Sequence, residues 1–409
     1  MTKRIVLIVA ILIIFLGAFF AFKINSEKTK KLTFWSIQLK PIYEKQINEI
    51  IAEFENKNPD YKVVWVDIPI QEAQKRTLAS ILSSTPPDLI NLNPEFSQIL
   101  AKKNALEFFD EIEVNDFHEG LVDKLRYKGE IYALPFYATS PVTIYNKDII
   151  KTEIKTYDDL FKNASKIYSE TEVAPFVASL NENDTLLKIL NKYDVTDFSN
   201  SEKTQIIKLF DEFNKMYKKG YLPKDTLAIN HREMIEKYMS GQVGLIVAGS
   251  NFIKMIKENA PDVYKKSAIS SQLVGTNAKY DVSLMNLVIP KKSKNKDMAR
   301  EFAYLLTSSE KQLELAKLTN VLPANIYALK DNYFKNCSSD IMDSARCISV
   351  KQLDNLAENN IEIKDKKLFN ETLNKAFESI LLNDKTDYNL IKKEIDFLLS
   401  SLNSLIEQN

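Results

Sequence analysis

The sequence predicts an α/β protein of two lobes with a helical C-terminal region. Three observations predict this class. The chain has 409 residues, which is too long for one ordinary core. Strand and helix patterns alternate twice along it, and from about Asp340 the pattern is nearly all helical. The first alternation indicates a mainly parallel sheet with helices on both faces.

The first alternation is a βαβαβ unit. Ile47, Ile50, Ile51 and Phe54 recur at helical spacing and predict a helix between two strands. The expected order is a strand over 32–35, a helix that opens at Pro41 and stops at 58–60, a strand over 61–68, a helix that ends before Pro86-Pro87, and a strand over 88–92.

The second alternation begins after residue 150. Thr156 and Asp159 resemble a capping box at the start of a helix that continues to about Ile167. Gly220 and Gly241 mark helix ends. Further helices are expected over 201–219, 230–240, 297–306, 310–318, 366–382 and 389–405, and strands over 243–248 and 284–289.

Composition excludes several function classes. Lys plus Arg and Asp plus Glu both number 55, and the basic excess of a nucleic-acid-binding protein is missing. There are only 8 glycines, and no Gly-rich phosphate-binding motif occurs. His118 and His231 are the only histidines, and both are expected to be solvated residues of a loop or helix start. The sequence predicts no metal site, no cofactor and no catalytic triad.

The N-terminus carries an apolar run, Ile5–Phe22, after Lys3 and Arg4. As a helix it would span roughly 27 Å, close to the thickness of a bilayer's hydrocarbon core. It is either an uncleaved membrane anchor, which we favour because small residues at a cleavage site are missing, or a cleaved signal peptide. Outside the cytoplasm, Cys337 and Cys347 could form a disulfide; otherwise they are two buried thiols.

Several blocks of sequence resemble one family in the correct order. "LTFWS", "FENKNPDYKVVWVDIP", "SSTPPDLINLNPE", "YKGEIYALPFYATSPVTIYNKDII", "GQVGLIVAGSNF", "LVIPKKSKNKDMAREFAYLLTS" and "TNVLPA" are similar to bacterial extracellular solute-binding proteins of ABC importers, in the class of maltose-binding protein. The resemblance implies a periplasmic-binding-protein-like fold with a ligand cleft between lobes. It assigns 32–138 and 287–322 to lobe 1 and 139–286 and 323–409 to lobe 2, after an anchor or signal and spacer over 1–31.

The resemblance also implies a ligand site on several loops. In place of the family's Pro-Trp the chain has Ser-Asn-Phe, so the ring that stacks on a sugar is assigned to Phe252. In the segment that crosses between lobes, Tyr132 and Tyr145 are expected to pack. The expected ligand contacts are Ser36, Gln38, Asn93, Glu95, Phe96, Tyr137, Thr139, Glu182, Asp184, Asn251, Phe252 and Phe369.

The function that this implies is capture of a sugar or oligosaccharide by a monomer that closes at a hinge and delivers the ligand to an ABC permease. Sugars offer apolar ring faces to aromatic side chains and hydroxyls to amides and carboxylates. The alternatives are a membrane-anchored enzyme that uses two carboxylates on carbohydrate, or a bilobal sensor or scaffold.

Overall fold

The structure is a computed structural model that describes residues 29–182, 184–357, 363–385 and 387–406. The chain divides into two compact units, and unit 1 comprises Met1–Phe136 and Leu284–Leu315. Unit 2 comprises Tyr137–Ser283 and Ala316–Asn409. The crossings thus follow residues 136, 283 and 315, whereas the sequence places them after 138, 286 and 322.

The expected membrane anchor or signal over 1–31 lies almost entirely outside the described residues. Among the residues that the structure describes, no helix has the length and apolar character needed to cross a bilayer.

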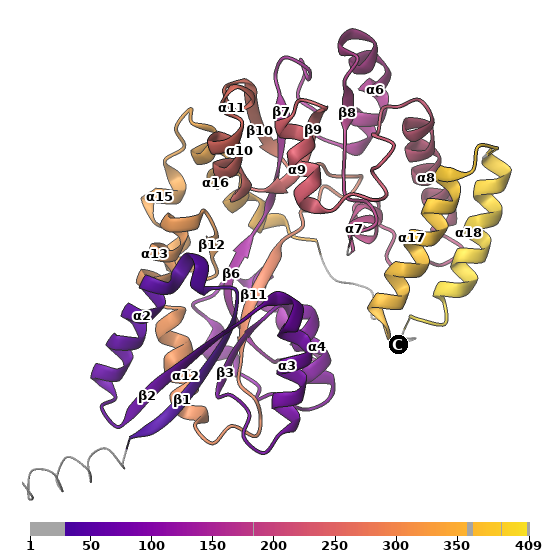
Figure 1. The fold of residues 1–409 in the computed structure, drawn as a ribbon. Helices are drawn as coiled ribbons and strands as arrows, with labels where there is room; N and C mark the ends of the chain where they lie inside the picture. Colours follow the sequence, from indigo (N-terminus) through magenta and orange to yellow (C-terminus); the bar gives the residue numbers. More distant parts are fainter. Residues whose placement is uncertain (1–28, 183, 358–362, 386, 407–409) are drawn as a thin grey trace, which may run out of the picture. The chain divides into compact units, whose positions relative to one another are not determined.

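Unit 1 is built on the βαβαβ unit that the sequence predicts (Figure 1). β1 pairs in parallel with both β2 and β3, and β11 pairs antiparallel with β3. The strands of the six-stranded sheet are β1 Lys30–Ile37, β2 Tyr61–Ile68, β3 Leu89–Leu92, β6 Leu134–Thr139, β11 Ser283–Val288 and β12 Leu322–Pro323, in the order β12-β6-β11-β3-β1-β2, and β12 belongs to the unit 2 part of the chain. β12 pairs with Tyr137 and Ala138, the unit 2 end of β6.

Long helices cover this sheet because each carries one apolar face. Phe302 packs its ring 5.5 Å from that of Phe34 and 5.0 Å from that of Phe54, which joins β1 to two helices. The helices of this part of the chain are α2 Lys40–Lys57, α3 Ile70–Leu82, α4 Pro94–Lys102, α5 Glu119–Val122, α12 Lys296–Leu306 and α13 Ser309–Thr319. A hairpin of β4 Arg126–Tyr127 and β5 Glu130–Ile131 turns at Lys128 and Gly129, whose φ values of 53° and 82° favour glycine.

Unit 2 contains a four-stranded sheet that is mostly antiparallel. The order is β10-β7-β9-β8, and only β8 and β9 are parallel. The strands are β7 Pro141–Asn146, β8 Ala174–Phe176, β9 Val243–Gly249 and β10 Ser267–Ser271. β10 was not predicted, because the residues of this strand, SAISS, lack the alternation of apolar and polar residues that indicates a strand.

The helices that the sequence predicted in unit 2 begin and end near the expected residues, whereas five shorter helices were not predicted. Thr156 and Asp159 form the expected capping box, with the Thr156 hydroxyl accepting from Asp159 N at 2.9 Å. The helices are α6 Tyr157–Thr171, α7 Thr185–Asn191, α8 Lys203–Lys218, α9 His231–Met239, α10 Phe252–Asn259, α11 Pro261–Lys266, α14 Ile326–Leu329, α15 Asn332–Lys335, α16 Ile341–Gln352, α17 Lys366–Leu382 and α18 Tyr388–Leu402. The five that were not predicted are α7, α10, α11, α14 and α15.

The C-terminal helices belong to the core of unit 2. α17 and α18 lie side by side against α8 (Figure 1). The ring of Phe377 on α17 lies 4.8 Å from that of Phe210 and 5.8 Å from that of Phe213, both on α8. The predicted helical region is therefore an integral layer of this unit.

Cys337 and Cys347 form a disulfide, as one of the two sequence-based readings expected. The bridge joins the segment after α15 to α16, and it closes a short loop. A disulfide with this loop length contributes about 2–3 kcal/mol in the chain-entropy account.

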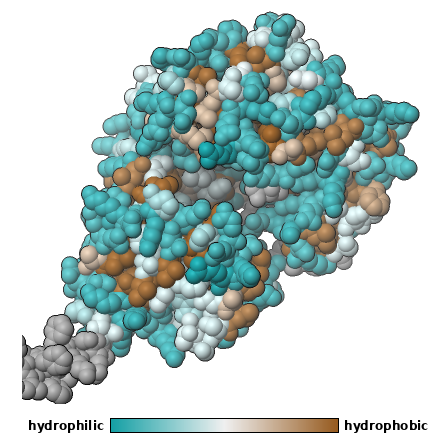
Figure 2. Space-filling view, in the orientation of Figure 1, coloured by the Kyte–Doolittle hydropathy of each residue, from teal (hydrophilic) through white to brown (hydrophobic). Residues whose placement is uncertain are grey.

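The face of the molecule drawn in Figure 2 is mainly hydrophilic, with apolar residues in small separate patches. Isolated apolar residues of this kind are ordinary for a surface that contacts water.

Candidate functional site

Two predicted ligand contacts, Ser36 and Gln38, lie at the end of β1 in unit 1, Ser36 within the strand and Gln38 just after it. Ser36 is fully buried; its hydroxyl donates to Asp67 Oδ1 at 2.5 Å and accepts from Trp65 Nε1 at 2.7 Å. Gln38 is exposed and has a φ of 51°. Ser36 therefore connects β1 to β2, and the expectation that its hydroxyl faces a ligand is wrong for this structure. Only Gln38 presents a side chain to solvent.

Asn93 follows β3 directly, and Glu95 and Phe96 lie in the first turn of α4. The Asn93 side chain caps α4, because its Oδ1 accepts from Phe96 N at 2.9 Å. Phe96 is buried, whereas Asn93 and Glu95 are exposed. The ring of Phe96 thus packs within unit 1, and the two polar residues remain candidates for ligand contact.

A chain of buried hydrogen bonds through two asparagines and a serine holds the backbone at Asn93. Asn91 Nδ2 donates to the carbonyl of Asn286 at 3.3 Å, and Asn286 Nδ2 donates to Ser97 Oγ at 2.8 Å. Ser97 Oγ donates in turn to the carbonyl of Asn93 at 3.0 Å. All three side chains are fully buried. The network therefore holds the junction between β3 and α4, where Asn93 and Glu95 lie.

The segment over 129–148 places its four aromatic rings in different surroundings. Phe136 is fully buried, and Tyr132 is almost so, with a hydroxyl that donates to the carbonyl of Lys124 at 3.1 Å. Burial raises the pKa of Tyr132. Tyr145 is half-buried against the core of unit 2, which agrees with its expected packing role. Tyr137 and Thr139 are half-buried on β6 and remain candidates.

Ser140, the residue after Thr139, belongs to a buried polar network in unit 2. Ser140 Oγ accepts from Gln352 Nε2 at 2.7 Å and donates to the carbonyl of Asp281 at 3.2 Å. The carboxylate of Asp281 pairs with the buried ammonium of Lys192 at 2.8 Å, and Lys192 also donates to Gln272 Oε1 at 3.0 Å. The network ties the unit 2 ends of two crossings, near Ser140 and Asp281, to α16. Nothing in the sequence pattern indicated it.

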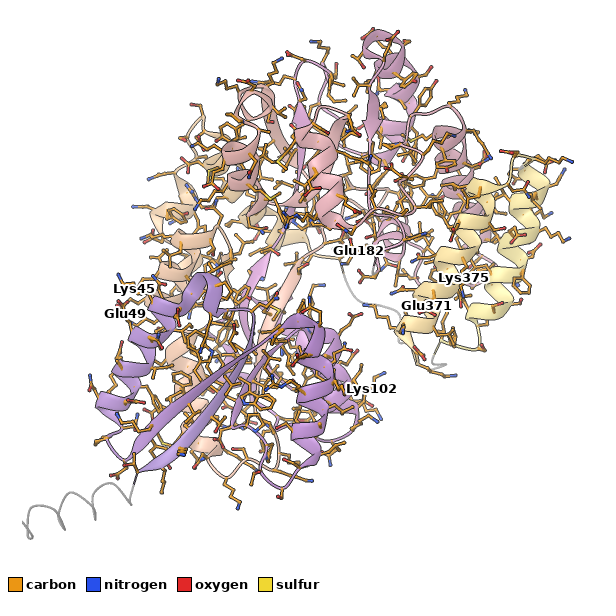
Figure 3. All side chains as sticks on the ribbon, in the orientation of Figure 1. Lys45, Glu49, Lys102, Glu182, Glu371 and Lys375 are labelled. Atoms are coloured by element: carbon orange, nitrogen blue, oxygen red, sulfur yellow. A yellow bond between two sulfur atoms is a disulfide. The ribbon has the colours of Figure 1, made fainter. Side chains whose placement is uncertain are left out.

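The loop after β8 holds Glu182 and Asp184, which the structure places in unlike settings. Glu182 Oε2 accepts from the backbone N–H of His231, at the start of α9, at 2.5 Å; Figure 3 shows Glu182 beside this end of the helix. Asp184 pairs with Lys188 at 2.8 Å and with Lys366 of α17 at 3.2 Å. Burial raises the pKa of Asp184, but the two lysines outweigh it and hold that pKa below its ordinary value.

His231 is the residue of this site that sequence reasoning missed. Its imidazole lies against Phe252, with ring centroids 5.0 Å apart and an interplanar angle of 64°. Burial lowers the pKa of His231, although the negative charge of Glu182 opposes this. His231 was predicted to be a solvated helix-start residue because Arg232 and Glu233 follow it. Its contacts lie far away in sequence, so no local signal could have revealed them.

Phe252 and Asn251 open α10 directly after β9. Phe252 is half-buried and Asn251 is exposed. The structure therefore brings together Glu182, His231 and Phe252 from three separate segments of unit 2. We call this group the Glu182–His231–Phe252 cluster.

α17 contacts the loop after β8 through Asn374, and not through the predicted residue Phe369. Phe369 is fully buried, with its ring 5.1 Å from that of Phe198, so its assignment as a ligand contact is wrong for this structure. On the neighbouring face, Asn374 Nδ2 donates to the carbonyl of Asn181 at 3.2 Å. The Oδ1 atoms of Asn181 and Asn370 have no hydrogen-bond partner among the described residues.

Helical periodicity could have shown this difference. Phe369, Leu373 and Phe377 recur four residues apart and form the buried stripe of α17. Asn370 and Asn374 also lie four apart, one position further on, and Asn374 contacts the Asn181 loop. Exposed Glu371 and Lys375 follow on the same helix (Figure 3).

No group of side chains among the described residues is arranged to hold a metal ion. The Glu182–His231–Phe252 cluster offers one aromatic ring, a carboxylate and an imidazole, and the amides of Asn181 and Asn374 lie on neighbouring segments of unit 2. This set suits a neutral polar molecule with an apolar face.

Comparisons with known proteins identify similar sequences. Residues 40–313 match the model of the family described as bacterial extracellular solute-binding protein. The chain is 24% identical over 295 residues to the diacetylchitobiose binding protein DasA of Streptomyces coelicolor, which covers 65% of this chain and 67% of that protein. It is 22% identical over 304 residues to the arabinooligosaccharide-binding protein of Bacillus subtilis, covering 68% of this chain and 70% of that protein.

Solved structures show the same fold. The sugar-binding protein MalE of Xanthomonas citri superposes with a TM-score of 0.76 at 18% identity, covering 92% of this chain and 98% of that chain. A binding protein from Thermotoga lettingae, solved with α-D-tagatose, gives a TM-score of 0.70 at 19% identity over 92% and 99% of the two chains. The predicted periplasmic-binding-protein-like fold class is thereby confirmed. With two thirds of its length matching the family model, the chain belongs to the bacterial extracellular solute-binding protein family.

Proposed function

We propose that this protein is the extracytoplasmic solute-binding component of an ABC importer and that its ligand is a sugar or oligosaccharide. The observation that carries the proposal is the Glu182–His231–Phe252 cluster, in which an aromatic ring lies beside hydrogen-bonding groups. A sugar presents an apolar ring face and a row of hydroxyls, and this combination matches both parts of the cluster.

The names of the relatives support a carbohydrate ligand. Proteins similar to this chain are named for diacetylchitobiose, arabinooligosaccharide and maltotriose. These names differ in the sugar, so they support the class of ligand. In this proposal the protein acts as a monomer, anchored or secreted at the outer face of the cytoplasmic membrane, and delivers its ligand to permease subunits.

The surroundings of Glu182 and Asp184 favour a binding function over a catalytic one. A glycosidase needs one carboxylic acid whose pKa is raised, so that it can protonate the leaving group. In contrast, lysines hold the pKa of Asp184 low, and a backbone N–H occupies the carboxylate of Glu182. We therefore prefer the binding function to the enzyme that uses two carboxylates.

As the family resemblance implies, we propose that the ligand is held between lobes that close at a hinge. Closure follows when the ligand binds the closed state more tightly than the open one. On this view Tyr137, Thr139, Gln38, Asn93 and Glu95 supply further contacts.

A thermal-shift screen tests the proposal. The purified protein is heated with a panel of disaccharides, oligosaccharides, polyols and phosphorylated polyols, since a ligand that binds only the folded state raises the melting temperature. We expect a shift with at least one sugar. That shift should be smaller in Phe252→Ala and unchanged in the matched control Phe397→Ala, whose ring is 70% exposed on α18.

A flat response to every sugar would overturn the carbohydrate ligand. The same samples are then analysed by chromatography. Hydrolysis products that vanish in Glu182→Gln would replace the binding function with an enzymatic one.

A further inference from the structure

We propose that His231 makes ligand binding depend on pH, with the neutral imidazole as the form that binds. This inference rests on the proposed function, because it assigns a regulatory property to the same cluster. It concerns a residue that neither the sequence pattern nor the family resemblance selected.

His231 is held by one backbone contact and one ring contact. Its backbone N–H donates to Glu182 Oε2 at 2.5 Å, which holds the first residue of α9 against the loop after β8. Its ring packs edge-on against Phe252, the ring assigned to ligand stacking, at 5.0 Å. A ligand that stacks on Phe252 would therefore lie within reach of the imidazole.

The charged groups around His231 are mostly paired with one another. Among the described residues, Glu182 is the charged group that acts on the imidazole, and its carboxylate oxygen accepts from the His231 backbone. On α9 itself, the Glu233 carboxylate accepts from the backbone N–H of Asn230, and Arg232 pairs with Glu236. On other elements, Asp184 pairs with Lys188 and Lys366, and Lys254 of α10 pairs with Glu258.

Burial among these groups already favours the neutral ring, and it holds the pKa of His231 below its ordinary value of 6.5. A neutral imidazole offers one donor and one acceptor, which suits sugar hydroxyls; the cation offers two donors and no acceptor. A bound ligand removes more water from the ring and so disfavours the cation further.

The sign of the pH effect follows from linkage. If the ligand prefers the neutral ring, the pKa of His231 is lower in the complex than in the free protein. Affinity is then constant above the pKa of the free protein and falls as pH decreases through it, by up to about tenfold per pH unit. At neutral pH the protein would bind fully, and acidification would release the ligand.

The test is isothermal titration calorimetry with the sugar from the screen that binds most tightly, at pH values from 5 to 8. The chain has only two histidines, so His118→Gln, placed at the start of α5 in unit 1, is a matched control for His231→Gln. We expect wild type and His118→Gln to lose about threefold or more in affinity on acidification. His231→Gln should show a nearly flat profile.

A profile for His231→Gln that is as steep as that of wild type would overturn the inference and leave the proposed function intact. If no sugar binds wild type at any pH, the proposed function itself fails. An NMR titration of the His231 ring gives a second readout: its pKa should fall when the sugar is added, and an unchanged or higher pKa contradicts the inference. Melting temperatures of both variants show that they are folded.

Discussion

The two units use their polar loop residues in different ways. In unit 1, the polar residues at the ends of β1 and β3 form hydrogen bonds that stabilise the fold itself, since Ser36 joins Asp67 to Trp65 and Asn93 caps α4. In unit 2, the loop after β8 connects separate segments, and it brings Glu182 to His231 and Phe252. A polar residue at the end of a strand is therefore not equivalent to a ligand contact.

Unit 2 also separates its structural polar groups from its candidate site. The Lys192–Asp281 pair belongs to a buried network, whereas the Glu182–His231–Phe252 cluster lies at the starts of α9 and α10. Substitutions that affect stability and those that affect affinity should therefore fall at different residues. Four predictions test this separation.

The largest effect is expected for Lys192→Met. The Lys192 side chain is 3% exposed, and its loss would leave the carboxylate of Asp281 without its ion-pair partner and remove one hydrogen bond from Gln272. Breaking a buried ion pair by removing one member costs about 3–5 kcal/mol in the free energy of unfolding. Urea denaturation measures the loss. The control Lys208→Met removes an exposed pair with Asp158 and should cost about 1 kcal/mol or less. Equal costs in the two variants would contradict the structural role.

Ser36→Ala should lower the free energy of unfolding by about 2 kcal/mol, because Trp65 Nε1 and Asp67 lose a buried partner. Its sugar affinity should stay close to that of wild type. Ser84→Ala, at an exposed position in unit 1, controls for the loss of a hydroxyl. A variant that keeps its stability but loses affinity would return Ser36 to the ligand site.

Phe252→Ala should show the opposite pattern. Loss of the stacking ring should weaken sugar binding by about tenfold, or about 1.4 kcal/mol. Titration calorimetry measures this, with Phe397→Ala as control. The free energy of unfolding should change less than for Ser36→Ala, since Phe252 is only half-buried. Unchanged affinity in Phe252→Ala would remove this ring from the site.

The smallest effect is expected for Asp184→Asn. Since Lys188 and Lys366 hold the pKa of Asp184 below its unfolded value, the carboxylate stabilises the fold above that unfolded value. This contribution is lost as pH falls through the folded pKa. At neutral pH the variant should lose about 1 kcal/mol. Its melting temperature should therefore fall less on acidification than that of wild type.

Melting temperatures between pH 3 and 7 provide the measurement. Asp384→Asn, at a fully exposed position, is the control and should follow wild type. If Asp184→Asn and wild type lose stability in parallel, the lysines do not act on Asp184 as the structure indicates.

Much of the architecture could be predicted because it rests on local patterns. The spacing of Ile47, Ile50 and Phe54 indicated α2, and the Thr156 capping box indicated the start of α6; both are present. The composition also pointed away from nucleic-acid binding before any fold was known. β10 escaped prediction because an edge strand of serines takes its structure from pairing with β7.

Patterns in the sequence were enough to predict the fold class, the family and the segments on which a site could lie. Which side chains those segments present depends on how the elements pack. Ser36 and Phe369 turn inward, Asn374 faces the Asn181 loop, and His231 meets Glu182 across 49 positions of sequence. Local periodicity fixes where helices and strands form, but burial and long-range hydrogen bonds depend on which elements pack together.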